Sequence, residues 1–255
     1  MKTEYLLDII LNIAYDLLVS GSEVGRVEQK IEKMCRAYEM EEVEVFIITS
    51  SIIVSVKDKE SRLFTQTKRI REYRTDFYRI YLLEQLAKEI EQKALEINQI
   101  EKAREDVENR VTTEHKKDGQ YNQYLLFSGI SMVFTLFFGG SIFDGIASFI
   151  CGFFIQLSMN ILKKIVTNRF MFNLVTSATG AFMAWLFCQL QFPISIDYVN
   201  IGNIMLLIPG LATVNAIKDL VSGELITGLL RLADALIQAV AVAFGFAMVM
   251  WFLGV

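Results

Sequence analysis

The chain has 255 residues, of which 53% are hydrophobic, and its mean hydropathy of +0.38 is too high for an ordinary soluble domain. Residues 1–122 hold 20 of the 25 Lys and Arg and 24 of the 29 Asp and Glu. Acidic and basic residues alternate there and the formal net charge is −4, so nucleic acid is not an expected partner. We therefore expect a polar domain over 1–122 and a membrane domain over 123–255.

The polar domain is predicted to be α+β. It begins with an amphipathic helix rather than a signal peptide, because a polar residue recurs at every fourth position from Glu4 to Asp16. A second helix is expected to begin near Val24. The runs "VEVFIITSSIIVSV" and "SRLFTQT", separated by the charged turn "KDKE", predict a hairpin. The helical pattern over 75–114 is long for one globular helix, so it predicts either two helices or one long arm leading into the membrane.

No catalytic constellation accompanies the titratable residues of this domain. Its sole histidine, His115, lies in a charged run and is interpreted as a surface residue. The three cysteines lie far apart, and neither a phosphate-binding loop nor a nucleophile elbow is found. We expect no enzyme activity, no cofactor and no metal site.

The second part contains five apolar segments of roughly the length that a bilayer of about 30 Å requires. They predict an α-helical polytopic domain of five transmembrane helices embedded in the lipid bilayer. The segments are 123–140, 143–162, 171–190, 200–217 and 226–253.

The loop charges predict the orientation of this domain. Lys163, Lys164 and Arg169 follow the second segment and Lys218 follows the fourth, whereas "GGSIFD" and "QFPISIDYVN" contain no Lys or Arg. Cytoplasmic loops retain basic residues. The polar domain and the N-terminus are therefore expected in the cytoplasm and the C-terminus outside.

Small and polar residues form stripes at helical spacing on the first three segments, which is typical of closely packed membrane helices. Gln156 and Asn160 are larger and need hydrogen-bonding partners at depth, so they are candidates for a polar path. On the fifth segment Arg231 and Asp234 share a polar face that is expected to point into protein or water. An alternative is that these two residues neutralise one another near the cytoplasmic end.

The fourth segment is interrupted by Pro209 and Gly210. Proline cannot donate to the helical ladder, so the segment is expected to form two half-helices whose free backbone groups face protein or a cavity. The second half would direct N–H groups at a carboxylate, with Thr213 and Asn215 following at once and Asp219 just below. The alternative is a simple proline kink accommodated by packing.

These residues resemble the bacterial threonine/serine exporter family, and in particular the N-terminal half that also occurs as one subunit of a split exporter. The resemblance covers nearly the whole chain, through "SGSEVGRVEQKIEKMCRAYEMEEVEVFIITSSIIVSV", "FFGGSIFDGIASFICGF" and, most specifically, "PGLATVNAIKDLVSGELITGLLRLADALIQAVAVAFG". It implies export of threonine, serine or a small dicarboxylate such as succinate across the bacterial inner membrane, driven by an ion gradient. It also implies a second five-span subunit, unless identical copies assemble instead.

We predict one functional unit in which Arg231 holds the substrate carboxylate, while Asp219 or Asp234 exchanges a proton or balances the arginine when the site is empty. The other residues predicted to bind substrate are Pro209, Gly210, Thr213, Asn215, Gln156 and Asn160. The competing hypotheses are a non-transporting membrane scaffold or sensor and a membrane-anchored enzyme.

Overall fold

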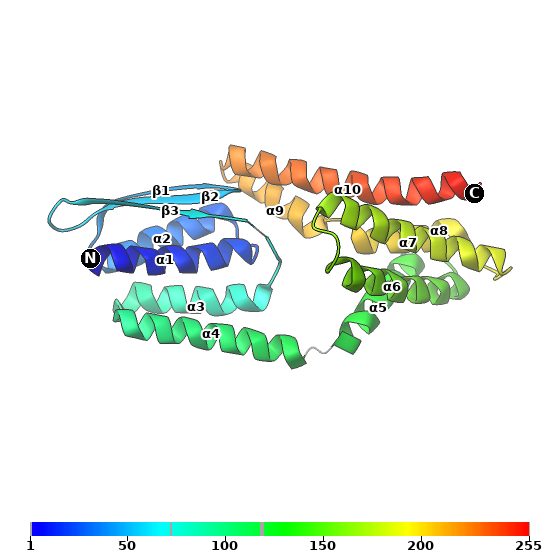
Figure 1. Ribbon diagram of the computed structural model, residues 1–255, viewed down its shortest axis with the longest axis horizontal. Coiled ribbons are helices and arrows are strands. Elements are labelled where there is room, and N and C mark those ends of the chain that lie inside the picture. Colours follow the sequence, from blue (N-terminus) through cyan, green and yellow to red (C-terminus); the bar gives the residue numbers. More distant parts are fainter. Residues whose placement is uncertain (1, 72, 118–119, 255) are drawn as a thin grey trace. The chain divides into compact units, whose positions relative to one another are not determined.

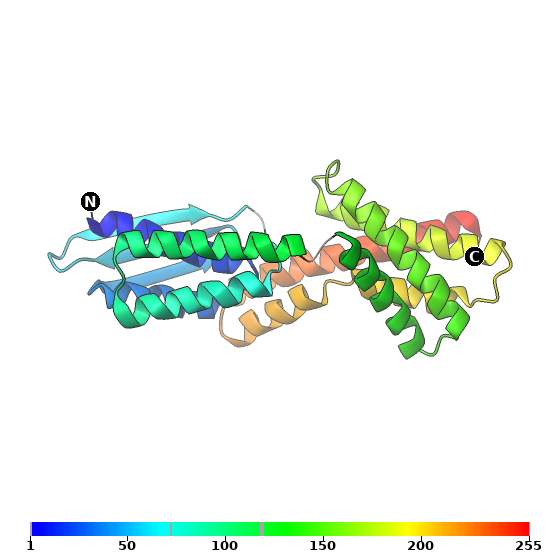
Figure 2. The ribbon, with the colours of Figure 1, turned by 90° about the horizontal axis from the view of Figure 1, so that it is seen from below.

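The computed structural model describes residues 2–71, 73–117 and 120–254. Its contacts divide the chain into two compact units, which are drawn in Figures 1 and 2. The first comprises Met1–Lys117 and Val214–Leu232, and the second comprises Asp118–Thr213 and Ala233–Val255. The segment Val214–Leu232 therefore contacts the polar part of the chain, whereas the predicted boundary after residue 122 assigned it to the membrane domain.

The first unit is layered, with α1 and α2 packed between a three-stranded sheet on one side and α3 and α4 on the other (Figure 1). Its elements within residues 1–117 are α1 (Lys2–Val19), α2 (Val24–Ala37), β1 (Glu41–Ile48), β2 (Ser51–Lys57), β3 (Leu63–Arg69), α3 (Phe77–Lys93) and α4 (Ile97–Lys117).

The sheet corrects the predicted two-stranded hairpin. The strands lie in the order β1-β2-β3 and both pairs are antiparallel. The apolar run expected as one strand turns back at Thr49 and Ser50, and Ile48 then pairs with Ser51. Small polar residues favour such a tight turn, and continuous β-branched residues on both sides concealed it.

Helix α1 is more deeply buried than an amphipathic surface helix. Its apolar residues, such as Leu7 and Ile10, belong to the core of the unit. Asp16, on the predicted polar face, is also buried, because that face packs against α3 and α4. Helix α2 begins at Val24 as predicted.

The pattern over 75–114 forms two helices, which was one of the two predicted outcomes. Asp76 caps α3 by accepting a hydrogen bond from the Arg79 N–H. The helix ends at Ala94, whose φ of 44° and ψ of 59° are left-handed.

The second unit is helical. Among the residues that the structure describes, three helices, α6, α7 and α10, are long and apolar enough to cross a membrane by length and composition. The bent pair α8 and α9 adds a fourth span if it is counted as one, and the apolar part of α5 is shorter. The bounds are α5 (Gln120–Phe137), α6 (Ile142–Leu162), α7 (Arg169–Gln189), α8 (Ile196–Leu207), α9 (Gly210–Val221) and α10 (Leu225–Leu253). Most of α9, from Val214 onward, and the start of α10 belong to the first unit.

Glycines bring the helices of this unit close together. A Cβ on Gly202 would lie 2.0 Å from the Thr135 hydroxyl oxygen, and one on Gly245 would lie 1.9 Å from the Ser177 hydroxyl oxygen. The backbones of α8 and α10 thus approach their neighbours where a methyl group has no room. The predicted packing role of the small-residue stripes agrees with these contacts.

Candidate functional site

Asp219, near the end of α9, is a buried charged residue with two partners in the first unit. It is 1% exposed. One carboxylate oxygen lies 2.6 Å from Arg231 Nη1, and the other accepts a hydrogen bond of 3.2 Å from the backbone N–H of Val24 at the start of α2. A helix N-terminus and a guanidinium are both suitable partners for a carboxylate group.

The guanidinium of Arg231 is enclosed but not fully occupied. Its side chain is 13% exposed, and its central carbon lies 5.4 Å from the centre of the Tyr73 ring. The second terminal nitrogen, Nη2, is buried and has no hydrogen-bond partner among the residues that the structure describes. Arg231 therefore retains a donor for a second acceptor.

Further contacts within the first unit hold the segment Val214–Leu232 against α2 and β1. Asn215 Nδ2 donates to the carbonyl of Gly21 at 3.3 Å, and the Thr227 hydroxyl donates to the carbonyl of Ile47 at 3.1 Å. Lys218 Nζ lies 2.9 Å from a carboxylate oxygen of Glu23. The predicted substrate residue Asn215 thus has a backbone partner in this unit.

Glu28 on α2 contributes a titratable group close to the same segment. Burial, and after it the negative charges of Glu224 and Glu32, raise the pKa of its carboxyl from 4.5 to about 7. A hydrogen bond with the backbone of Ile47 acts in the opposite direction. The carboxyl therefore changes protonation near neutral pH.

Asp234 has its charged partner in the second unit, so it is not neutralised by Arg231 as the alternative interpretation held. One of its carboxylate oxygens lies 3.6 Å from Arg169 Nη1 and accepts a hydrogen bond of 2.8 Å from Gln238 Nε2. Both members of the Arg169 pair are about half exposed. Arg231 and Asp234 share a helix, yet their charged partners are Asp219 and Arg169.

Gln156 and Asn160 find the polar partners that their depth led us to expect. Asn160 Nδ2 donates to the Tyr124 hydroxyl at 3.0 Å. Gln156 Nε2 lies 3.5 Å from both Gln123 Oε1 and Asn160 Oδ1. These residues form a polar group between α5 and α6.

The break at Pro209 separates two helices that are bent by 51°. The N–H and the hydroxyl of Thr213 both donate to the carbonyl of Pro209, at 3.0 and 2.9 Å. The Gly210 N–H donates to the carbonyl of Ile208 at 2.8 Å. The structure thus contains the two predicted half-helices, with the Thr213 hydroxyl committed to the first turn of α9.

A buried polar group in the second unit joins residues of the predicted stripes to Asn203, which sequence reasoning did not single out. The hydroxyl of Ser131 donates to Asn203 Oδ1 at 2.6 Å and also contacts Ser148, which accepts from Thr135. Asn203 Nδ2 is buried without a hydrogen-bond partner among the described residues. In the sequence, Asn203 is marked only as an amide residue in the middle of an apolar segment.

Comparisons with known proteins give matches that cover almost the whole chain and that name the same kind of protein, a transporter or exporter. The family model described as "Putative threonine/serine exporter" matches residues 8–253. A Klebsiella aerogenes protein named "Probable succinate transporter subunit YjjP" is 25% identical over 252 residues, which are 95% of this chain and 93% of the relative. A Mycobacterium tuberculosis protein named "Probable threonine/serine exporter" is 24% identical over 252 residues, which are 96% of this chain but only 46% of the relative. No solved structure gives a significant match.

Proposed function

From the premise that the chain belongs to the threonine/serine exporter family, we propose that it is a subunit of a secondary transporter that exports small carboxylate-bearing metabolites. The substrate class is threonine and serine, or a small dicarboxylate such as succinate, in keeping with the names of the two relatives. The chain would lie in the bacterial inner membrane.

The observation that carries this proposal is the broken pair α8 and α9 among apolar helices. Backbone groups that are freed at membrane depth are tolerated only inside protein or beside a water-filled cavity. Transporters use such breaks to direct half-helix N-termini at anionic substrate groups. In the second unit, the first-turn N–H groups of Leu211 and Ala212 would supply these donors, because those of Gly210 and Thr213 already donate to the carbonyls of Ile208 and Pro209. Gln156 and Asn160 would line a polar path.

Within the first unit, Arg231 is the residue best suited to receive a substrate carboxylate. Its Nη2 is a buried donor without a partner among the described residues, while Nη1 is held by Asp219. A carboxylate that engages both nitrogens would displace Asp219, which could then accept a proton or a cation. We propose Asp219 as a coupling residue on this basis, assign Asn215 a supporting role, and keep Asp234 as a second coupling candidate.

A second membrane subunit is part of the proposal. The chain matches 93% of a relative named as a subunit, but 46% of a relative named as an exporter. The remainder of the longer relative would correspond to a separate five-span partner, which would join the five spans proposed for this chain. Assembly of identical copies is the alternative.

The proposed orientation, with residues 1–117 in the cytoplasm and the C-terminus outside, is supported by the basic loops. A membrane-impermeant thiol reagent should label a cysteine added after Val255 and spare one placed at Thr3. The reverse labelling pattern would reject this orientation.

The function is tested by export from cells that are loaded with labelled L-threonine, L-serine or succinate, with and without this chain and its candidate partner. Arg231→Lys should reduce export of the accepted solute at least tenfold, because an ammonium cannot reproduce a bidentate contact. Arg26→Lys, at an exposed position on α2, is the matched control. Absence of chain-dependent export for all three solutes would reject the proposed substrates, and full export by an abundant Arg231→Lys variant would move the site to Gln156 and Asn160.

A further inference from the structure

A groove in the first unit, separate from the residues discussed above, lies between α1, α3 and α4. Its volume of 510 Å³ is within the range of small-molecule sites. The charged residues that line it are Asp8, Arg79, Glu101, Arg104, Glu105 and Glu108.

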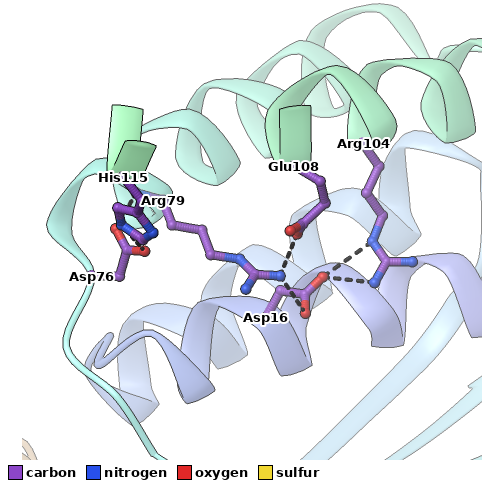
Figure 3. A network of polar contacts seen from close by, with 6 residues as sticks. All are labelled: Asp16, Asp76, Arg79, Arg104, Glu108 and His115. Carbon is purple, nitrogen blue, oxygen red and sulfur yellow. Dashed lines mark hydrogen bonds and ion pairs between the residues drawn. The ribbon is translucent and has the colours of Figure 1, made fainter. Parts of the chain in front are cut away.

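A buried carboxylate fixes both arginines of the groove (Figure 3). Asp16 Oδ2 accepts hydrogen bonds from Nε and Nη2 of Arg104 at 3.1 and 2.7 Å. Asp16 Oδ1 lies 3.1 Å from Nη2 of Arg79, and that same nitrogen contacts Glu108. The guanidinium planes are therefore held in place before any ligand arrives.

The arginines keep donors that Asp16 does not use. The third nitrogen of Arg104 points away from Asp16 in Figure 3, and its side chain is 35% exposed. Arg79 is 7% exposed, and its Nε is buried without a hydrogen-bond partner among the described residues. A fixed guanidinium edge of this kind matches a carboxylate group.

The remaining charged residues that line the groove are acidic. Glu101, Glu105 and Glu108 lie on one face of α4 because they are four and three residues apart, and Asp8 faces them from α1. Burial raises the pKa of Glu108, and the negative charge of Asp16 raises it further. The excess of carboxylates over guanidiniums favours a ligand that brings a positive group.

We propose that this groove binds a small zwitterionic amino acid, with its carboxylate on the outer edge of Arg104 and its ammonium among Glu101, Glu105 and Glu108. The positive and negative side chains that line the groove identify the ligand class as a zwitterion. The choice of threonine or serine within that class rests on the proposed function. Arg104 and these three glutamates all lie on α4, and Asp8 lines the same groove from α1, so a ligand in this position would contact both helices. The polar part of the chain would thereby respond to the internal concentration of the exported solute.

The experiment measures binding by calorimetry on the full chain in detergent, with L-serine, with lactate, which lacks the ammonium, and with ethanolamine, which lacks the carboxylate. L-Serine should bind at least tenfold more tightly than either analogue. Glu105→Gln should weaken L-serine binding about tenfold, as expected for the loss of one charge-assisted contact. Asp106→Asn is the matched control, because this exposed neighbour pairs with Arg110 and does not line the groove.

Glu105 has no part in the Asp16 network, so its variant tests binding without removing the contacts of Arg104. L-Serine should also slow hydrogen exchange in α1 and α4. No binding of L-serine, or equal binding by Glu105→Gln and the wild type, would overturn the inference even if the chain exports amino acids. Binding with the expected pattern but without export would support the groove and reject the proposed function.

Discussion

The two compact units are stabilised by different kinds of polar contact. In the first, charged side chains on different elements meet as ion pairs, such as Asp16 with Arg79 and Asp219 with Arg231. In the second, side-chain hydroxyls and an amide, such as those of Ser131 and Asn203, form hydrogen bonds next to glycines at which the helices approach closely. Small residues allow helices to approach in an apolar medium, whereas full charges are costly there. The hydroxyl and amide contacts of the second unit are therefore of the kind that suits closely packed apolar helices.

The largest effect on stability is expected at Gly202 of the second unit, where the packed helices leave no room for an added methyl group. Gly202→Ala places a methyl group 2.0 Å from the Thr135 hydroxyl oxygen and 2.7 Å from the Ser131 carbonyl, and a carbonyl cannot rotate away. We expect destabilisation of more than about 3 kcal/mol, because the helices must separate. Gly129→Ala on α5 is the control, since a Cβ there meets nothing within 4 Å. Abundance in the membrane and thermal unfolding measure the difference, and equal behaviour of the two variants would contradict this account of the packing.

A smaller effect is expected from breaking the buried ion pair of the first unit. Asp219→Asn leaves Arg231 buried without its counter-charge, which costs about 3 kcal/mol. The double variant Asp219→Asn with Arg231→Gln should recover part of this loss, because no uncompensated charge remains. Asp234→Asn removes a half-exposed pair and should cost less than about 1 kcal/mol. If the two single aspartate variants unfold at the same temperature, the contrast between the buried and the exposed pair is refuted.

The smallest effect concerns the pH dependence of the first unit. Because the folded-state pKa of Glu28 is about 7 and its ordinary value is 4.5, the folded chain keeps a proton that the unfolded chain has lost between these pH values. Stability should therefore fall as the pH rises from about 4.5 to 7 and then level off. Glu28→Gln should flatten this profile and stabilise the chain at pH 8 by about 1 kcal/mol, a value reduced to allow for partial exposure. Thermal unfolding at several pH values measures this, with Glu89→Gln on α3 as the control; an unchanged slope in Glu28→Gln would assign the titration to another group.

Local features of this chain could be predicted from sequence because they depend on neighbouring residues. The start of α2 at Val24 and the interruption at Pro209 follow from the position of apolar residues and from the missing proline donor. The need of Gln156 and Asn160 for polar partners follows from the cost of burying an amide. Each of these predictions depends on residues that lie within a few helical turns of one another in the sequence.

Tertiary pairing could not be predicted in the same way. Helical spacing places Arg231 and Asp234 on one face, but it does not reveal that Asp219, on the preceding helix, is the nearer carboxylate. The tight turn at Thr49 and Ser50 was hidden by β-branched residues on both sides. The hydrogen bond from Val24 to Asp219 joins residues 195 positions apart, and no local pattern records it.

The membership of Val214–Leu232 in the first unit has a consequence for biosynthesis. The ribosome completes residues 1–117 early, but the segment that supplies Asp219 and Thr227 emerges only after α5 to α8 have been translated. Until then the N–H of Val24 and the carbonyl of Ile47 lack the partners they have in the finished chain. The packing of the N-terminal unit is therefore completed only after α5 to α8 have been translated.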